Sequence, residues 1–166
     1  MEDNYIMLNG NKVPLTEEQV ASLLGGNETA CAKVDPFERK MLRRYFYIGN
    51  NGEVLDDNDN MGITDGERYN AGNYCRDKEM MNQRAMHETL NRLLWRYSEQ
   101  HGGDNEWDNE TRHYFVSIKR GNEPYVNGFT YSQPFGVVFF KDEETAKSAI
   151  HDVVKPFLAE HPDFVW

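Results

Sequence analysis

The spacing of hydrophobic residues along the chain predicts two elements at its start. Residues 5–15 carry apolar side chains on both sides of Asn9-Gly10, a pair that tolerates positive φ in tight turns, and this indicates a β-hairpin. Thr16 begins a capping-box spacing before apolar positions at helical intervals, which predicts a helix ended by two glycines. We expect this hairpin and helix to form an extension over residues 1–26.

The next stretch predicts a short helix, a second hairpin and a loop. Asp35 followed by proline is typical of a helix start. Residues 45–48 are apolar or aromatic, residues 53–55 include Val54 and Leu55, and the two segments flank an Asn-Asn-Gly turn, so they are expected to pair as strands. Residues 56–67 are rich in Asp, Asn and Gly, which favours a loop.

A long amphipathic helix is predicted over residues 78–100. Asp77 is placed to cap its start, and Gly102-Gly103 is placed to end it. Trp95 lies off the apolar stripe, where it could contact a second layer. The stripe itself has helical spacing and consists of Met81, Ala85, Leu90, Leu93, Leu94 and Tyr97.

The last third of the chain predicts three strands and a helix. Residues 112–119 and 125–131 alternate around a turn, and Gly128 inside the second strand suggests a bulge. Residues 135–140 are the most apolar of the three, so we expect them to form the central strand. Asp142 is placed to cap a final helix, which Pro156 ends or restarts.

Strands that precede and follow helices in this order predict an α+β fold. We expect an antiparallel β-sheet packed on one long amphipathic helix and a C-terminal helix, with the N-terminal β-hairpin–helix as an extension. The main domain is predicted over residues 35–160, and residues 161–166 are left as a C-terminal tail.

Composition and charge narrow the classes of function. The net charge is -10, from 28 acids against 18 bases, so the chain repels phosphate backbones and we expect no direct nucleic-acid binding. Cys31 and Cys75 are isolated, which is typical of reduced thiols. The start of the chain lacks a signal-peptide pattern, and no apolar run approaches the ~20 residues of a membrane span, so we expect a cytoplasmic protein.

Two segments come close to a known metal-binding motif, but each lacks a residue that the motif requires. Asp56, Asn58, Asn60 and Glu67 occupy ligand positions of an EF-hand loop, but Met61 stands where the loop requires glycine. We therefore expect a solvated acidic loop, with a weak divalent-cation site as the alternative.

The second near-motif is in the long helix. His87-Glu begins a zinc-helix pattern whose second histidine is replaced by Asn91. With no phosphate-loop, dinucleotide or nucleophile-elbow motif in the chain, we expect no cofactor and no catalytic residue.

Two further arrangements remain as alternatives to a packed core. Cys75 and His113 could meet in space as a nucleophile and a base, although a buried, inert cysteine is the simpler reading. Aromatic residues on the predicted strands could stack single-stranded nucleic acid, although cross-strand packing explains them and the acidic charge opposes the platform.

The acidic residues are concentrated in two segments, 53–67 and 104–110. If these segments converge, they form a negative face that suits a partner with a basic surface and could imitate a DNA backbone. The residues of this predicted acidic face are Glu53, Asp56, Asp57, Asp59, Asp65, Glu67, Asp104, Glu106, Asp108 and Glu110.

Four segments, 44–54, 65–74, 87–95 and 135–146, resemble an uncharacterised family of small proteins carried by temperate phages and mobile elements of Gram-positive gut bacteria. The resemblance covers residues 35–160 and implies no catalytic residue. It implies an acidic, non-enzymatic accessory protein that binds and inhibits a host defence or nucleic-acid-handling protein, in the manner of an anti-CRISPR protein. The alternatives are a structural or regulatory phage protein that forms a homodimer, and a weak metal-dependent enzyme that uses the 56–67 loop or His87.

Overall fold

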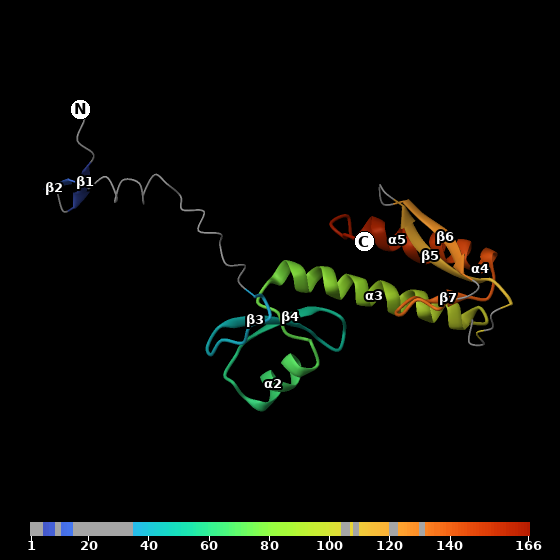
Figure 1. Cartoon of the computed structure of the whole chain (residues 1–166), viewed down its shortest axis with the longest axis horizontal. Helices are drawn as coiled ribbons and strands as arrows, with labels where there is room; N and C mark the ends of the chain where they lie inside the picture. Colours follow the sequence, from blue (N-terminus) through green and yellow to red (C-terminus); the bar gives the residue numbers. More distant parts are fainter. Residues whose placement is uncertain are drawn as a thin grey trace. The chain divides into compact units, whose positions relative to one another are not determined.

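The structure, a computed structural model, describes residues 5–8, 11–14, 35–103, 107, 110–119, 123–129 and 132–166, and it divides into two compact units, Met1–Glu38 and Arg39–Trp166. In the first unit, β1 (Tyr5–Leu8) pairs antiparallel with β2 (Asn11–Pro14), which confirms the predicted hairpin (Figure 1). The predicted helix that starts at Thr16 lies outside the described residues.

The short helix predicted after Asp35 is wrong, because the chain forms a single turn there. The Asp35 side chain accepts a hydrogen bond from the Phe37 amide at 2.9 Å, and its carbonyl accepts one from the Glu38 amide at 3.2 Å. An Asp side chain that bonds two residues ahead makes an Asx turn, which competes with a continuing helix. Leu42 then adopts φ 58°, a value that no right-handed helix can include.

The second hairpin is confirmed, but it is longer than predicted. β3 (Arg44–Ile48) pairs antiparallel with β4 (Val54–Asn58), so Asp56, Asp57 and Asn58 are strand residues and not loop residues. A helix, α2 (Ile63–Asn70), also lies in the region predicted as a loop and lead-in. Pairing with β3 holds residues 56–58 in a strand, and the Asp65 carboxylate stabilises the start of α2. These two contacts outweigh the loop-forming composition of the segment.

The long helix is confirmed with its predicted bounds. α3 spans Lys78–Gln100, and the Asp77 side chain accepts a hydrogen bond from the Met80 amide at 3.1 Å. At its end, the Gly103 amide bonds the Ser98 carbonyl, and both Gly102 and Gly103 have positive φ. Trp95 is 60% exposed, so it is not buried against a second layer of described residues. The buried residues of the helix are Met81, Ala85, Leu90, Leu94 and Ser98.

The third sheet has three strands in the order β6-β5-β7, and all its pairs are antiparallel. Its strands are β5 (His113–Lys119), β6 (Glu123–Phe129) and β7 (Phe139–Phe140). The prediction of a central strand over residues 135–140 is therefore wrong, since only two of its residues pair and they lie at an edge. A turn at Phe135 and Gly136, the latter with φ 76°, keeps the earlier residues out of the sheet.

The bulge predicted at Gly128 is also wrong. The register between β5 and β6 is continuous, with Tyr114 opposite Gly128. A Cβ atom at this position would lie 2.8 Å from Nε of Arg112 and 3.0 Å from the His113 carbonyl oxygen. Glycine therefore permits a close approach of the neighbouring strand and does not mark an extra residue.

Three consecutive helical segments follow the sheet. α4 (Glu143–Ala149) is capped by Asp142, as predicted, and leads without a break into the π-helical turn η1 (Ile150–Val154) and then α5 (Lys155–Glu160). Pro156 has no amide hydrogen for the carbonyl four residues earlier, and a π turn widens the helix at such a point. Proline therefore restarts the helix here. No helix among the described residues is long and apolar enough to cross a membrane.

Two hydrophobic clusters share α3. The N-terminal half of the helix contributes Met81 and Ala85 to a small cluster with Ile48 and Cys75 of the β3 region. The C-terminal half contributes to a larger cluster with β7, α4, η1 and α5 (Figure 1). The buried residues of this larger cluster are Leu90, Leu94, Phe140, Ala146, Ala149, Val154, Phe157 and Phe164.

The last six residues, set apart as a tail in the sequence analysis, contribute to this core. Phe164 is buried, and the Gln83 side chain bonds the backbone on both sides of it. The Gln83 amide nitrogen donates to the Asp163 carbonyl at 2.8 Å, and its oxygen accepts from the Val165 amide at 2.9 Å. His87 adds a 2.8 Å hydrogen bond between Nε2 and the Val165 carbonyl. The segment is therefore fastened along α3.

Truncation of Phe140 to alanine should destabilise the Arg39–Trp166 unit by roughly 3–5 kcal/mol, because this fully buried ring fills the centre of the larger cluster. Urea unfolding followed by circular dichroism measures the change. The same substitution at Phe37, which is 44% exposed, is the control and should change the free energy of unfolding by less than about 1 kcal/mol. Equal effects would contradict the assigned core.

Candidate functional site

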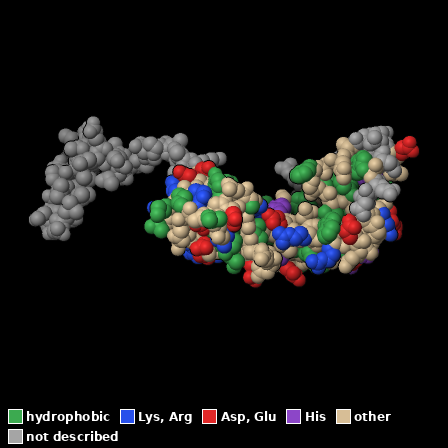
Figure 2. All heavy atoms as spheres, turned by 90° about the horizontal axis from the view of Figure 1, so that it is seen from below, with side chains coloured by type: hydrophobic (Ala, Val, Ile, Leu, Met, Phe, Trp, Pro, Cys, Tyr) green, Lys and Arg blue, Asp and Glu red, His purple; other side chains and the backbone are tan. Residues whose placement is uncertain are grey.

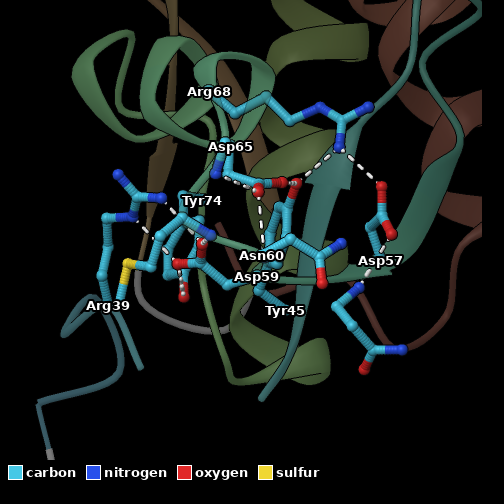
Figure 3. A network of polar contacts seen from close by, with 11 residues as sticks. Arg39, Tyr45, Asp57, Asp59, Asn60, Asp65, Arg68 and Tyr74 are labelled. Carbon is cyan, nitrogen blue, oxygen red and sulfur yellow. Dashed lines mark hydrogen bonds and ion pairs between the residues drawn. The ribbon is translucent and has the colours of Figure 1, made fainter. Parts of the chain in front are cut away.

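Two carboxylates are buried in the region formed by β3, β4 and α2. Asp59 follows β4 and is 0% exposed, and Asp65 lies in the first turn of α2 and is 6% exposed. Figure 3 shows both side chains inside a network of polar contacts. A buried charge is costly unless it is paired and hydrogen-bonded, so the partners of these two groups determine what the site can do.

Asp59 is held by three different partners. Arg39 binds it with a two-pronged contact, from Nη2 to Oδ1 at 2.7 Å and from Nε to Oδ2 at 2.9 Å. The Tyr74 hydroxyl donates to Oδ2 at 3.1 Å, and the Met61 amide donates to Oδ1 at 2.8 Å (Figure 3). Paired hydrogen bonds from a guanidinium are among the strongest contacts available to a carboxylate.

Asp65 holds the start of α2. Its Oδ2 accepts from the amides of Asn60 at 3.0 Å and Gly62 at 3.1 Å, and its Oδ1 accepts from the Tyr45 hydroxyl at 2.8 Å. Gly62 is the residue before the helix and has no side chain to cap it. The carboxylate of Asp65 therefore reaches back to satisfy amides that a helix start leaves unpaired.

The two carboxylates are joined by a pair of stacked tyrosines. The rings of Tyr45 and Tyr74 lie 4.3 Å apart at 16°, and each hydroxyl donates to one carboxylate. Arg68 then donates to the Tyr45 hydroxyl and to Asp57 Oδ2, the latter at 3.2 Å. The network thus runs from the interior to the exposed end of β4.

These contacts shift the pKa values away from neutrality. Hydrogen bonds from Arg39 lower the pKa of Asp59 to about 2, and the Tyr45 hydroxyl lowers the pKa of Asp65. Burial raises the pKa of Tyr45 to about 12. A general acid or base works best with a pKa near the working pH, so these groups suit a structural role and not proton transfer.

Among the described residues of the predicted acidic face, two are buried and two are paired with arginines. Asp59 and Asp65 are buried, so they cannot contact a partner, and this corrects their assignment to the face. Asp56 and Asp57 are exposed but are paired with Arg44 and Arg68. Glu53, Glu67 and Glu110 are exposed, whereas Asp104, Glu106 and Asp108 lie outside the described residues.

Among the described residues, no arrangement supports the metal-site alternative or the pairing of Cys75 with His113. Asp56 and Asn58 lie in a β-strand and not in a calcium-binding loop. Within the described ranges, no three His, Cys, Asp or Glu side chains are grouped to hold a metal ion. Cys75 packs in the small cluster on α3, whereas His113 stacks on Trp107 at β5, at a ring distance of 3.8 Å.

An exposed group of apolar side chains, the apolar patch, surrounds the Asp59 network. Figure 2, viewed from the side on which α2 lies, shows hydrophobic side chains at the surface of the β3–β4–α2 region. Scattered exposed hydrophobic residues are normal, whereas several large ones on neighbouring segments favour an interaction site. The apolar patch consists of Met41 at 65% exposed, Leu42 at 68%, Met61 at 48%, Ile63 at 83% and Tyr69 at 43%.

Contacts with Asp59 hold this patch together. The Leu42 amide donates to the Asp59 carbonyl at 2.7 Å, and the Met61 amide donates to its side chain. The guanidinium carbon of Arg39 lies 5.9 Å from the centre of the Tyr69 ring. One buried aspartate therefore positions three segments of the surface at once.

Leu42 and Met61 both have φ 58°, in the left-handed region that L-residues with side chains rarely adopt. Each such residue costs about 1–2 kcal/mol, and this cost is sustained only where surrounding contacts fix the backbone. Both strained residues present large apolar side chains to water. Strain combined with exposure is a feature of functional surfaces more than of folding.

No family model, curated protein or solved structure matches this chain. The assignment of the surface therefore rests on geometry. Sequence reasoning missed the arginines and tyrosines of the network, and it placed Asp59 and Asp65 in solvent. The spacing from Gly62 to Asp65 was the available signal, because an acid three residues after the N-cap can accept from the N-cap amide, which is one half of a capping box.

Substitution of Asp59 by asparagine should destabilise the protein by roughly 3 kcal/mol, because Arg39 loses its buried counter-charge. The matched control is Asp56→Asn, which breaks an exposed Asp–Arg pair and should have a much smaller effect. Chemical denaturation of both variants measures the difference. Similar losses would show that burial of Asp59 does not determine its contribution.

Acid should selectively weaken the Asp59 network. The pKa of the Asp59 carboxyl is about 2 in the folded protein, below the ordinary value of 3.8. The unfolded chain therefore binds the proton more readily. The stabilisation is complete above the ordinary pKa and is lost as the pH falls through about 2. Urea unfolding between these limits should show the difference between wild type and Asp59→Asn shrinking; a constant difference would exclude this linkage.

Proposed function

We propose that the chain is a non-enzymatic protein-binding module and that its apolar patch is the centre of the interface. The observation that carries this proposal is the pair of strained, exposed residues, Leu42 and Met61, fixed by the buried Asp59. Binding sites place apolar side chains at the centre of an interface, and methionine adapts well to a partner surface.

The charge around the apolar patch indicates the chemistry of the partner. Glu67 is exposed on α2, which also carries Ile63 and Tyr69 of the patch. Asp56 and Asp57 are exposed on the adjoining strand β4, where they bind arginines of this chain. Those two carboxylates are therefore already paired. The exposed Glu67 beside the patch and the net charge of -10 suit a partner whose contact surface is apolar at its centre and basic at its edge.

This proposal gives charge a smaller role than the DNA-mimic hypothesis did. Two carboxylates of the 53–67 segment are buried and two bind arginines, so that segment supplies few free charges for an imitation of a phosphate backbone. The contribution of apolar contacts becomes larger than that of charge. The phage resemblance adds the proposal that the partner is a host defence or nucleic-acid-handling protein and that binding inhibits it.

Affinity capture from a host lysate with variant chains tests the proposal. The bait carries either the wild-type surface, Leu42→Gly with Ile63→Ser, or Trp95→Ala as an exposed control on α3. A specific partner should be retained by the wild type and the control and lost with the double variant. Retention of the partner by all three chains would exclude the apolar patch as the binding site. Loss of the partner only at high salt would assign the contact to the acidic residues alone.

Replacement of Leu42 by glycine should separate binding from stability. Glycine adopts φ 58° without strain, so the variant should be as stable as the wild type or more stable by up to about 1 kcal/mol. Its affinity for the captured partner should fall about tenfold or more, because an interface anchor is removed. Thermal unfolding and calorimetric titration measure the two effects. A destabilised variant with unchanged affinity would contradict the proposed role.

A further inference from the structure

A second apolar site, which shares no residue with the apolar patch, lies along α3. It is a pocket of about 360 Å³ between α3, the segment before β7 and the end of the chain. Polar and amphipathic groups of the lining come from His87, Asn91 and Trp166. Its apolar lining comes from Leu90, Leu94, Val116, Val138 and Phe164. A pocket of this size accepts an aromatic side chain.

The charge near this pocket differs from that of the whole chain. Glu88, which also lines it, binds Arg84 at 2.9 Å and Arg92 at 2.8 Å, so these three side chains carry a net positive charge. Residues 132–138, which form another wall, contain no charged side chain. Glu88, the one carboxylate side chain among the described residues of the lining, is thus paired with two arginines, so two copies of a chain with net charge -10 can meet at this surface with little charge repulsion.

An aromatic side chain projects from the wall of the pocket. Phe135 is 104% exposed, so its ring is not packed against any of the described residues. Gly136, the next residue, has φ 76° and lines the pocket, and no atom lies within 4 Å of the position where its Cβ would stand. The turn therefore exposes the Phe135 ring to solvent, while Gly136 beside it lines the pocket.

We propose that the pocket binds Phe135 of a second copy of this chain, so that two copies exchange phenyl rings about a two-fold axis. A projection and a hollow that adjoin on one surface meet reciprocally in such a pair, which closes the assembly at a dimer. The ring cannot enter the pocket of its own chain, because its own turn forms the wall. The contact is small, so the dimer is weak and depends on concentration.

Sedimentation velocity from about 5 µM to about 500 µM tests this dimer, a range suited to a small interface. The wild-type mass should rise from one chain towards two. Phe135→Ala and Asn91→Trp, which respectively remove the projecting ring and fill the pocket, should stay monomeric throughout. Phe135→Leu should retain part of the association, and Trp95→Ala, an exposed aromatic of α3 outside the pocket, should behave as the wild type.

Three outcomes would overturn the proposal. The wild type could stay monomeric, and an apolar dye whose binding is abolished by Asn91→Trp would then assign the pocket to a small apolar ligand. Phe135→Ala could associate as the wild type does, which would place any dimer on another surface. Asn91→Trp could associate while Phe135→Ala does not, which would place the two phenyl rings against each other. Far-UV circular dichroism confirms that each variant is folded.

Discussion

The fold depends on one helix that must be apolar towards two different neighbours. The first half of α3 packs on the β3 region through Met81 and Ala85, and the second half packs under the β7–α4–α5 region through Leu90 and Leu94. Neither cluster is complete without its half of the helix. A single hydrophobic stripe along 23 residues therefore holds both parts of the Arg39–Trp166 unit in register.

The β3 region has a small apolar cluster, and a polar network supplements it. Asp59 and Asp65 use hydrogen bonds to fix the chain between β4 and α2, where regular strand or helix pairing is absent. Removal of one partner of such a network leaves an unpaired charge, so the arrangement is sensitive to substitution. The same rigidity keeps Leu42 and Met61 in their strained conformations. Stability and surface shape thus have one origin in this part of the protein.

The long helix could be predicted from sequence because its signals are local. Asp77 caps it, two glycines end it, and the period of its apolar residues is regular over six turns. The failures at residues 56–70 and 135–140 have another cause. Strand pairing with β3 and ion pairs with Arg39 and Arg68 connect residues far apart in sequence, and composition carries no information on such partners. An acid-rich segment was therefore interpreted as solvated, although Asp59 and Asp65 are buried and Asp56 and Asp57 are paired with arginines.

The surroundings of the tryptophans give the protein an optical reporter of its own. Trp95 stands in solvent, and Trp107 stacks on His113. Trp166, by contrast, lines the α3 pocket beside Phe164, and the hydrogen bonds to the preceding residues hold it there. Trp166 is the one tryptophan among the described residues that line this pocket, so displacement of water from the pocket changes the polarity around its indole. Its emission wavelength therefore distinguishes an occupied pocket from an empty one without any attached label.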